Sequence, residues 1–210
     1  MGRPILSFLT TALILAALFL LAIQLDLIPL VREGFNKNPL WGASLYVFLL
    51  VLGTVISPVT TLPIVPFVAS VFGPFETAVL SVFGWTLGAA AVFGVVKFGF
   101  LPFIIRFVSG NRLAYYEQFL PEKTRFWFLV LFRMVVPVEF SSYLIAIFTT
   151  IGFGEYLLGT AIGVLPFAFI FSYTGPAFLS DDIFQLGLLA VFAILIFSLA
   201  YFLLVRRMKK

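Results

Sequence analysis

The most constraining feature of this chain is a long apolar stretch that prolines interrupt. Residues 40–96 contain no Lys, Arg or Asp and only one acid, Glu76. A helix needs about 20 apolar residues to cross a hydrocarbon core of about 30 Å, so this stretch is too long for one crossing. Pro58, Pro63 and Pro66 prevent a continuous helix, because proline lacks an N–H group and clashes with the preceding turn. Broken backbone at membrane depth needs partners in the protein or a water-filled cavity.

The composition indicates that lipid is the solvent for most of the chain. Of its 210 residues, 62% are hydrophobic and 10% are charged, and its mean hydropathy is +1.18. A soluble domain averages about half apolar and a quarter charged residues. The few charged side chains cannot cover so much apolar surface in water. We therefore expect an all-α polytopic membrane protein with a single membrane domain, residues 1–210.

The chain contains neither cysteine nor histidine. Disulfides, thiolate metal ligands, cysteine nucleophiles and histidine-based catalysis are therefore excluded. No carboxylate pair or nucleophile–base pair can be assembled at membrane depth from the remaining residues. We expect no enzyme, no metal site and no cofactor. The net charge of +4 is explained by membrane orientation and does not indicate binding to nucleic acid.

The hydropathy pattern predicts four spanning helices and two re-entrant hairpins. The predicted spans are residues 5–25, 75–96, 153–175 and 184–205. The predicted hairpins are residues 40–72 and residues 126–151, of which the second is broken at Pro137. Residues 97–125 interleave charged and apolar side chains, which favours a helix in the cytoplasmic membrane interface.

Two blocks of the sequence match at one constant offset. The matched pairs are Pro58 with Pro137, Gly73 with Gly152, Glu76 with Glu155, and Gly84 with Gly163. Each block is a proline-broken hairpin followed by a span, which predicts an inverted repeat of the kind found in secondary transporters. We expect the prolines and glycines, including Pro63 and Pro66, to form the hinges of the hairpins. Glu76 and Glu155 are expected to complement the helix dipole at the start of a span.

The basic residues predict the orientation. Four of them follow the last span and five lie in residues 97–125, whereas residues 26–39 contain two. Because cytoplasmic loops carry the excess of Lys and Arg, both termini are expected in the cytoplasm. The two hairpins then enter the bilayer from opposite faces.

Arg133 is the most informative ionisable residue, because it stands alone in an apolar run four residues before Pro137. A charge at membrane depth costs about 2.5 kcal/mol or more on insertion scales. Arg133 either binds a phosphate through its planar guanidinium or is a structural residue paired with a lipid headgroup or with Glu139. Glu139 is either a proton carrier or a counter-ion. Ser141 and Ser142 make the neighbouring turn polar.

Other small and polar residues have a packing explanation and a functional one. Thr60 and Thr61, between the prolines of the first hairpin, either line a cavity or satisfy broken backbone. Two glycine pairs have the spacing that lets membrane helices approach closely. They are Gly84 with Gly88 and Gly159 with Gly163.

Four pieces of sequence, in a fixed order over residues 40–180, carry a resemblance to a known family. They are residues 58–66 leading into Phe72-Gly73-Pro74, Phe132-Arg133 leading into Pro137, residues 154–160, and Gly163-Val164-Leu165-Pro166. Together they resemble the DedA superfamily, also called the VTT or SNARE-associated domain, in its short bacterial and cyanobacterial branch.

The resemblance implies two opposed re-entrant hairpins, a place in the inner membrane and involvement in lipid movement. Members of the family are linked to phospholipid scrambling and to flipping of undecaprenyl phosphate. Arg133 matches the hairpin arginine of the family, and Pro137 matches the proline beside it. Glu139 stands near the position of a second arginine, and residues 57–72 contain no acid. The resemblance therefore implies lipid movement in general rather than proton-coupled flipping.

These observations predict a lipid translocase or scramblase that moves phospholipid or polyprenyl-phosphate headgroups. The predicted substrate-binding residues are Thr60, Thr61, Arg133, Glu139, Ser141 and Ser142. The expected partners are membrane lipids, through their phosphate groups, and a homo-oligomer is also compatible with the sequence. Two alternatives stay open at this point, a secondary transporter for a small solute and a membrane-organising factor that transports nothing.

Overall fold

The computed structural model describes residues 33, 37–56, 61–100, 122–149 and 151–208. Every regular element in this part of the chain is a helix. The elements are α3 (Pro39–Val55), α4 (Ile64–Phe72), α5 (Pro74–Gly94), the π-helix η1 (Val95–Phe100), α8 (Glu122–Val135), α9 (Val138–Phe148), α10 (Phe153–Leu179) and α11 (Ile183–Met208). The all-helical prediction is confirmed for these residues. The predicted span 5–25, Pro58, Thr60 and residues 101–121 of the predicted interfacial segment lie outside them.

Among the described residues, three helices are long and apolar enough to cross a membrane. They are Pro74–Phe98, Phe153–Leu179 and Ile183–Arg206, and these three candidate spans cover the residues of three predicted ones. The second one continues past its predicted end at residue 175, because Pro176 lies inside α10 and does not end it. Membrane helices tolerate such a proline when neighbouring groups satisfy the freed backbone.

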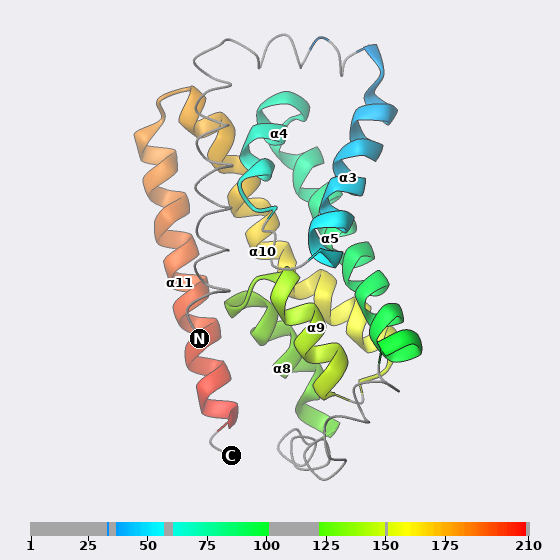
Figure 1. Ribbon diagram of the computed structural model, residues 1–210. Helices are drawn as coiled ribbons and strands as arrows, with labels where there is room; N and C mark the ends of the chain where they lie inside the picture. Colours follow the sequence, from blue (N-terminus) through cyan, green and yellow to red (C-terminus); the bar gives the residue numbers. More distant parts are fainter. Residues whose placement is uncertain (1–32, 34–36, 57–60, 101–121, 150, 209–210) are drawn as a thin grey trace.

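The remaining helices form two hairpins that point toward each other. In Figure 1, α3 runs from the upper end of the molecule to its middle, and α4 returns to the upper end. The pair α8 and α9 does the same from the lower end, and each hairpin is followed by a long helix, α5 or α10. The two blocks thus share one order of elements and have opposite directions. The helix α8 begins at Glu122, one turn before the predicted start of the hairpin.

Prolines set the breaks at the tips of the hairpins, as predicted. Pro63 is the N-cap of α4, and Pro66 lies in the first turn, where a missing N–H removes no helical bond. Pro137 is the N-cap of α9 and has an extended backbone, with φ −49° and ψ 143°. The residue before a proline avoids helical backbone angles, and here that residue is Val136. The helix α8 therefore ends at Val135.

The predicted hinge glycines Gly73 and Gly152 both lie directly before a long helix. Gly73 has φ 100°, in a region that side-chain-bearing residues rarely adopt. Gly152 has φ −67° and makes no special demand on the backbone. The repeat therefore conserves the place of this glycine but not its conformation.

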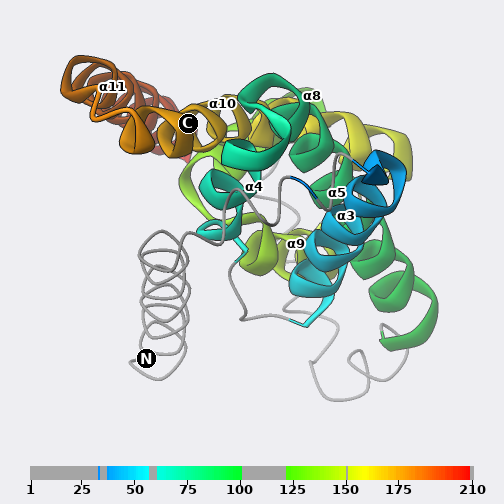
Figure 2. The ribbon, with the colours of Figure 1, turned by 90° about the horizontal axis from the view of Figure 1, so that it is seen from above.

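The two long helices form the centre of the molecule. The helix α5 packs along α10, α3 packs on α5, and α8 packs on α10. Each short helix packs against the long helix of the other half, since α4 packs mainly on α10 and α9 packs on α5. The helix α11 lies at one edge against α8 and α10 (Figure 2). Each half of the molecule is therefore completed by a short helix of the other half.

Each glycine pair lets a hairpin helix approach the long helix of its own block. A Cβ atom on any of the four glycines would collide with a side chain opposite. The contacts are Gly84 with Leu50, Gly88 with Thr54, Gly159 with Leu129, and Gly163 with Arg133. The two packed pairs on α3 and α8 have the same four-residue spacing, so Thr54 holds the place in the first block that Arg133 holds in the second. By packing partner, Gly163 therefore corresponds to Gly88. The sequence match instead aligned Gly163 with Gly84, which lies one helical turn earlier in α5.

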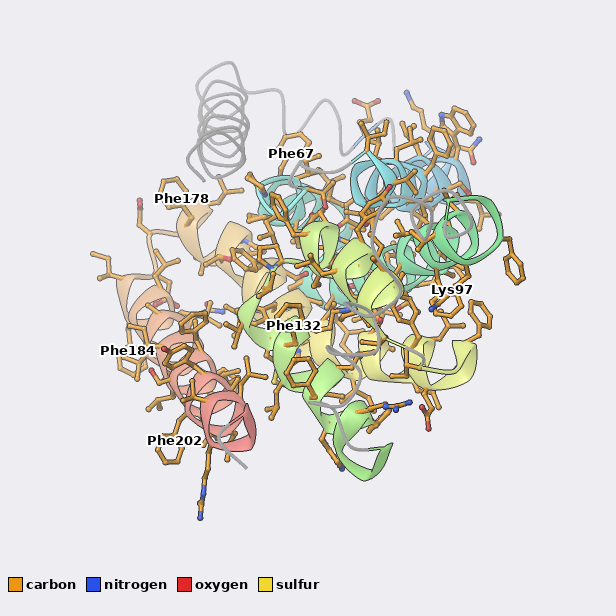
Figure 3. All side chains as sticks on the ribbon, turned by 60° about the horizontal axis from the view of Figure 1, so that its bottom comes forward. Phe67, Lys97, Phe132, Phe178, Phe184 and Phe202 are labelled. Atoms are coloured by element: carbon orange, nitrogen blue, oxygen red, sulfur yellow. The ribbon has the colours of Figure 1, made fainter. Side chains whose placement is uncertain are left out.

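The outer surface carries many large apolar side chains. On α11, Phe184 is 82% exposed and Phe202 is 61% exposed, and Figure 3 shows both extending away from the neighbouring helices. An exposed apolar surface of this extent is not stable in water and is suited to lipid. The structure therefore agrees with the composition in indicating a membrane protein.

Gly175 on α10 offers a test of the contact between the two halves. An added Cβ atom would collide with the backbone carbonyl of Pro66 on α4, which has little freedom to move. We expect Gly175→Ala to lower the free energy of unfolding by about 1–3 kcal/mol, measured as thermal unfolding in detergent. Gly187→Ala on α11, where no atom lies within 4 Å, is the matched control and should be neutral or slightly stabilising. Equal stability of the two variants would contradict the close contact.

Candidate functional site

Arg133 lies in the last turn of α8 and is almost completely buried, with 3% of its surface exposed. Its Nη1 donates to Ser141 Oγ at 2.7 Å and to Ser142 Oγ at 2.8 Å. The same atom lies 3.0 Å from the carbonyl oxygen of Val138. Its Nη2 donates to Thr160 Oγ1 of α10 at 3.1 Å. The charge is thus held by neutral oxygen atoms from two helices.

The three hydroxyl groups around Arg133 are oriented by their own helices. Each donates its proton to the carbonyl oxygen four residues earlier. The bonds are Ser141 to Pro137 (3.0 Å), Ser142 to Val138 (2.6 Å) and Thr160 to Tyr156 (2.7 Å). Because each hydroxyl has one proton, its lone pairs are left to accept from the guanidinium. The oxygens are therefore preorganised for a cation.

The ring of Tyr156 completes the enclosure of Arg133. Its centroid lies 5.2 Å from Arg133 Cζ, which is a favourable cation–π distance. Its hydroxyl donates to the carbonyl oxygen of Ser142 at 3.3 Å. Gly163, where an added Cβ atom would collide with Arg133 Cβ, allows α8 to come close enough to α10 for these contacts.

Glu139 joins the tips of the two hairpins. It lies in the first turn of α9 and is 1% exposed. Its Oε1 accepts from the backbone N–H of Thr61 at 3.1 Å and from Thr61 Oγ1 at 3.0 Å. Trp85 of α5 donates from Nε1 to Thr61 Oγ1 at 3.0 Å. Oε1 of Glu139 therefore accepts from the backbone N–H of Thr61, which the break in the first hairpin leaves without a partner in a helix.

A second bond ties the hairpins together beside Glu139. The hydroxyl of Tyr143 on α9 donates to the carbonyl oxygen of Val55, the last residue of α3, at 2.5 Å. This carbonyl is one of the groups that a helix end leaves without an intrahelical partner. The break in each hairpin is thus satisfied in part by the other hairpin.

Arg133 and Glu139, both within the described residues, do not form a direct ion pair, so of the alternatives left open for Arg133 the structure does not show the pairing with Glu139 across the proline. The reason is that each residue has its own partners, hydroxyl groups for Arg133 and Thr61 for Glu139. Each also has a buried polar atom, Arg133 Nε and Glu139 Oε2, with no hydrogen-bond partner among the described residues. Leaving such an atom unsatisfied costs about 1–3 kcal/mol.

Both residues line a cavity of about 150 Å³. The turn from Arg133 to Glu139 forms one wall, and Leu62 and Trp85 contribute from the first half of the molecule. The remaining wall is apolar and comes from α10 and α11, with Val164, Phe167, Phe171 and Phe197. Apolar walls with a few convergent polar groups are typical of a ligand site.

The structure brings five of the six predicted binding residues into one region. They are Thr61, Arg133, Glu139, Ser141 and Ser142; Thr60 lies outside the described residues. Glu76 and Glu155 are exposed in the first turns of α5 and α10, as expected for residues that complement a helix dipole.

Sequence reasoning missed three residues of the long helices. Trp85, Tyr156 and Thr160 contact the two hairpins. A signal was present, since Trp85 follows Gly84 and Thr160 follows Gly159. A residue beside a packing glycine lies close to the same helix interface.

Comparison of the chain with models of protein families, with curated proteins and with solved structures found no match. The resemblance to the DedA superfamily stays a prediction from the sequence.

The hydroxyl of Thr160 provides a test of the Arg133 site. Thr160→Val keeps the shape of the side chain and removes the acceptor of Nη2. Because a hydrogen bond to a charged group contributes about 1.5–3 kcal/mol, we expect a loss of that size in thermal unfolding. Thr86→Val is the matched control, because Thr86 bonds the carbonyl of Val82 at 2.6 Å in the same way without accepting from Arg133. A loss no larger than that of the control would show that Thr160 does not stabilise the guanidinium.

Proposed function

We propose that this protein is a lipid translocase that moves phosphate-bearing headgroups across the bilayer past Arg133. The observation that supports this most strongly is the buried Arg133 in the wall of an apolar cavity where two opposed hairpins meet. A guanidinium is suited to phosphate, because it is always charged and presents several donors in one plane.

The proposed membrane arrangement contains four spans and two re-entrant hairpins. The pairs α3–α4 and α8–α9 would enter from opposite faces, and residues 5–25 would form the fourth span. Both termini would lie in the cytoplasm, and the membrane would be an inner membrane, as in the DedA superfamily to which we propose that the chain belongs. Broken helices that meet near the bilayer midplane are the common plan of inverted-repeat transporters.

The cavity supplies the reason to favour a lipid over a soluble substrate. Phe197 of α11 forms part of its wall, and most of α11 faces away from the protein. A headgroup could therefore reach Arg133 beside α11 while its acyl chains stay in the bilayer. The guanidinium of Arg133 would replace part of the water that the phosphate loses, which lowers the barrier to its passage.

Reconstitution into liposomes tests this proposal. We expect the purified protein to expose fluorescent phospholipid of the inner leaflet to an impermeant quencher faster than empty liposomes do. Arg133→Gln should slow the movement by about tenfold or more, equivalent to about 1.4 kcal/mol of barrier. Arg206→Gln, an equal change at an exposed position near the end of α11, should match the wild type. No acceleration over empty liposomes, or equal rates for the two variants, would contradict the proposal.

Single cysteines test the proposed hairpins, because the chain has no cysteine of its own. Leu40→Cys and Glu76→Cys flank the first hairpin at the upper end of Figure 1, and Arg125→Cys and Glu155→Cys flank the second at the lower end. We expect an impermeant thiol reagent to label the first two from one face of the membrane and the other two from the opposite face. Labelling of Leu40→Cys and Glu76→Cys from opposite faces would mean that the first hairpin crosses the bilayer.

A further inference from the structure

The guanidinium of Arg133 reaches the backbone directly before Glu139, yet the two side chains do not pair. Nη1 of Arg133 lies 3.0 Å from the carbonyl oxygen of Val138, and both charged residues are buried and line one cavity. Opposite charges attract each other more strongly in a dry interior than in water. An ion pair between them would therefore be expected unless the carboxylate had other partners.

Thr61 supplies these partners from the tip of the other hairpin. Its backbone N–H at 3.1 Å and its hydroxyl at 3.0 Å both donate to Oε1 of Glu139. Hydrogen bonds to an ionised group are stronger than those between neutral groups. Two such bonds from one residue hold the carboxylate on the side of the first hairpin.

Trp85 fixes the direction of the hydroxyl bond. An indole N–H donates and cannot accept, so Thr61 Oγ1 accepts from Trp85 Nε1 at 3.0 Å. The single proton of the hydroxyl is then left for Glu139. Trp85 is 1% exposed and Thr61 is 2% exposed, so water has little access to either bond.

We infer that Thr61 is a positioning residue, which holds the carboxylate of Glu139 away from the Arg133 guanidinium. The charge of Arg133 is thereby left available to a phosphate, because the hydroxyl groups that bind it do not neutralise it. If the carboxylate paired with Arg133, a phosphate would first have to displace it. This role of Thr61 rests on the proposed function, in which Arg133 binds the headgroup.

The liposome assay tests this role with Thr61→Val, which keeps the shape of the side chain and removes its hydroxyl. We expect the variant to move fluorescent phospholipid about tenfold more slowly than the wild type, equivalent to about 1.4 kcal/mol of barrier, because Glu139 turns to Arg133. Thr61→Ser restores the hydroxyl and should restore most of the rate. Thr86→Val, the same loss on α5 outside this cavity, should match the wild type. A wild-type rate for Thr61→Val, or a rate for Thr61→Ser as low as that of Thr61→Val, would overturn the inference.

A second background separates positioning from a merely structural role. In Glu139→Gln no carboxylate competes for Arg133, so the addition of Thr61→Val should cause little further loss of rate. A tenfold loss that persists in this background would mean that Thr61 acts without Glu139, and the inference would be wrong.

A structure of Thr61→Val decides the question without lipid movement. We expect the carboxylate of Glu139 to form an ion pair with Arg133 in this variant, and unchanged positions of the two side chains would contradict the inference. If Thr61→Val does not fold, Trp85→Phe replaces it in both measurements, because it removes the donor that orients the hydroxyl. A wild type that moves lipid no faster than empty liposomes would overturn the proposed function, whereas this structure would still test the role of Thr61.

Discussion

The burial of the Arg133 guanidinium is the constraint on which the centre of this molecule depends. A charge removed from water is tolerated only when preorganised groups replace its hydration. Here three hydroxyl groups of α9 and α10 do so, and each is oriented by a bond to its own helix. The close contact between α8 and α10 at Gly163 is required for the same reason, since a wider spacing would move Thr160 away from Arg133.

The order of helices along the chain was largely predictable, because it depends on local properties. Apolar length located three helices long enough to span a membrane, and prolines located the breaks at Pro63 and Pro137. Arg133, Ser141 and Ser142 were also recognisable, since polar side chains within an apolar run need one another.

The contacts between the halves were not predictable in this way. Thr61 meets Glu139 only because α4 and α9 each begin at the middle of the molecule, and sequence spacing does not determine which tip groups meet. Trp85 and Thr160 reach the site through the rotation of α5 and α10, which the glycine contacts fix. The alternative of an ion pair between Arg133 and Glu139 rested on their closeness in sequence, whereas Glu139 is bonded to a residue of the other hairpin.

The two halves repeat the same order of helices but carry different polar side chains at the site. The first half contributes Thr54 where the second half contributes Arg133, and both cavity charges come from the second half. The first half contributes the donors that bind Glu139, at Thr61. Any movement that separates the tips must break these two bonds and the bond from Tyr143 to Val55, whereas the bonds of Arg133 lie within α8, α9 and α10 and can persist. In such a movement the second half keeps the Arg133 site assembled, because the partners of Arg133 come from its own helices.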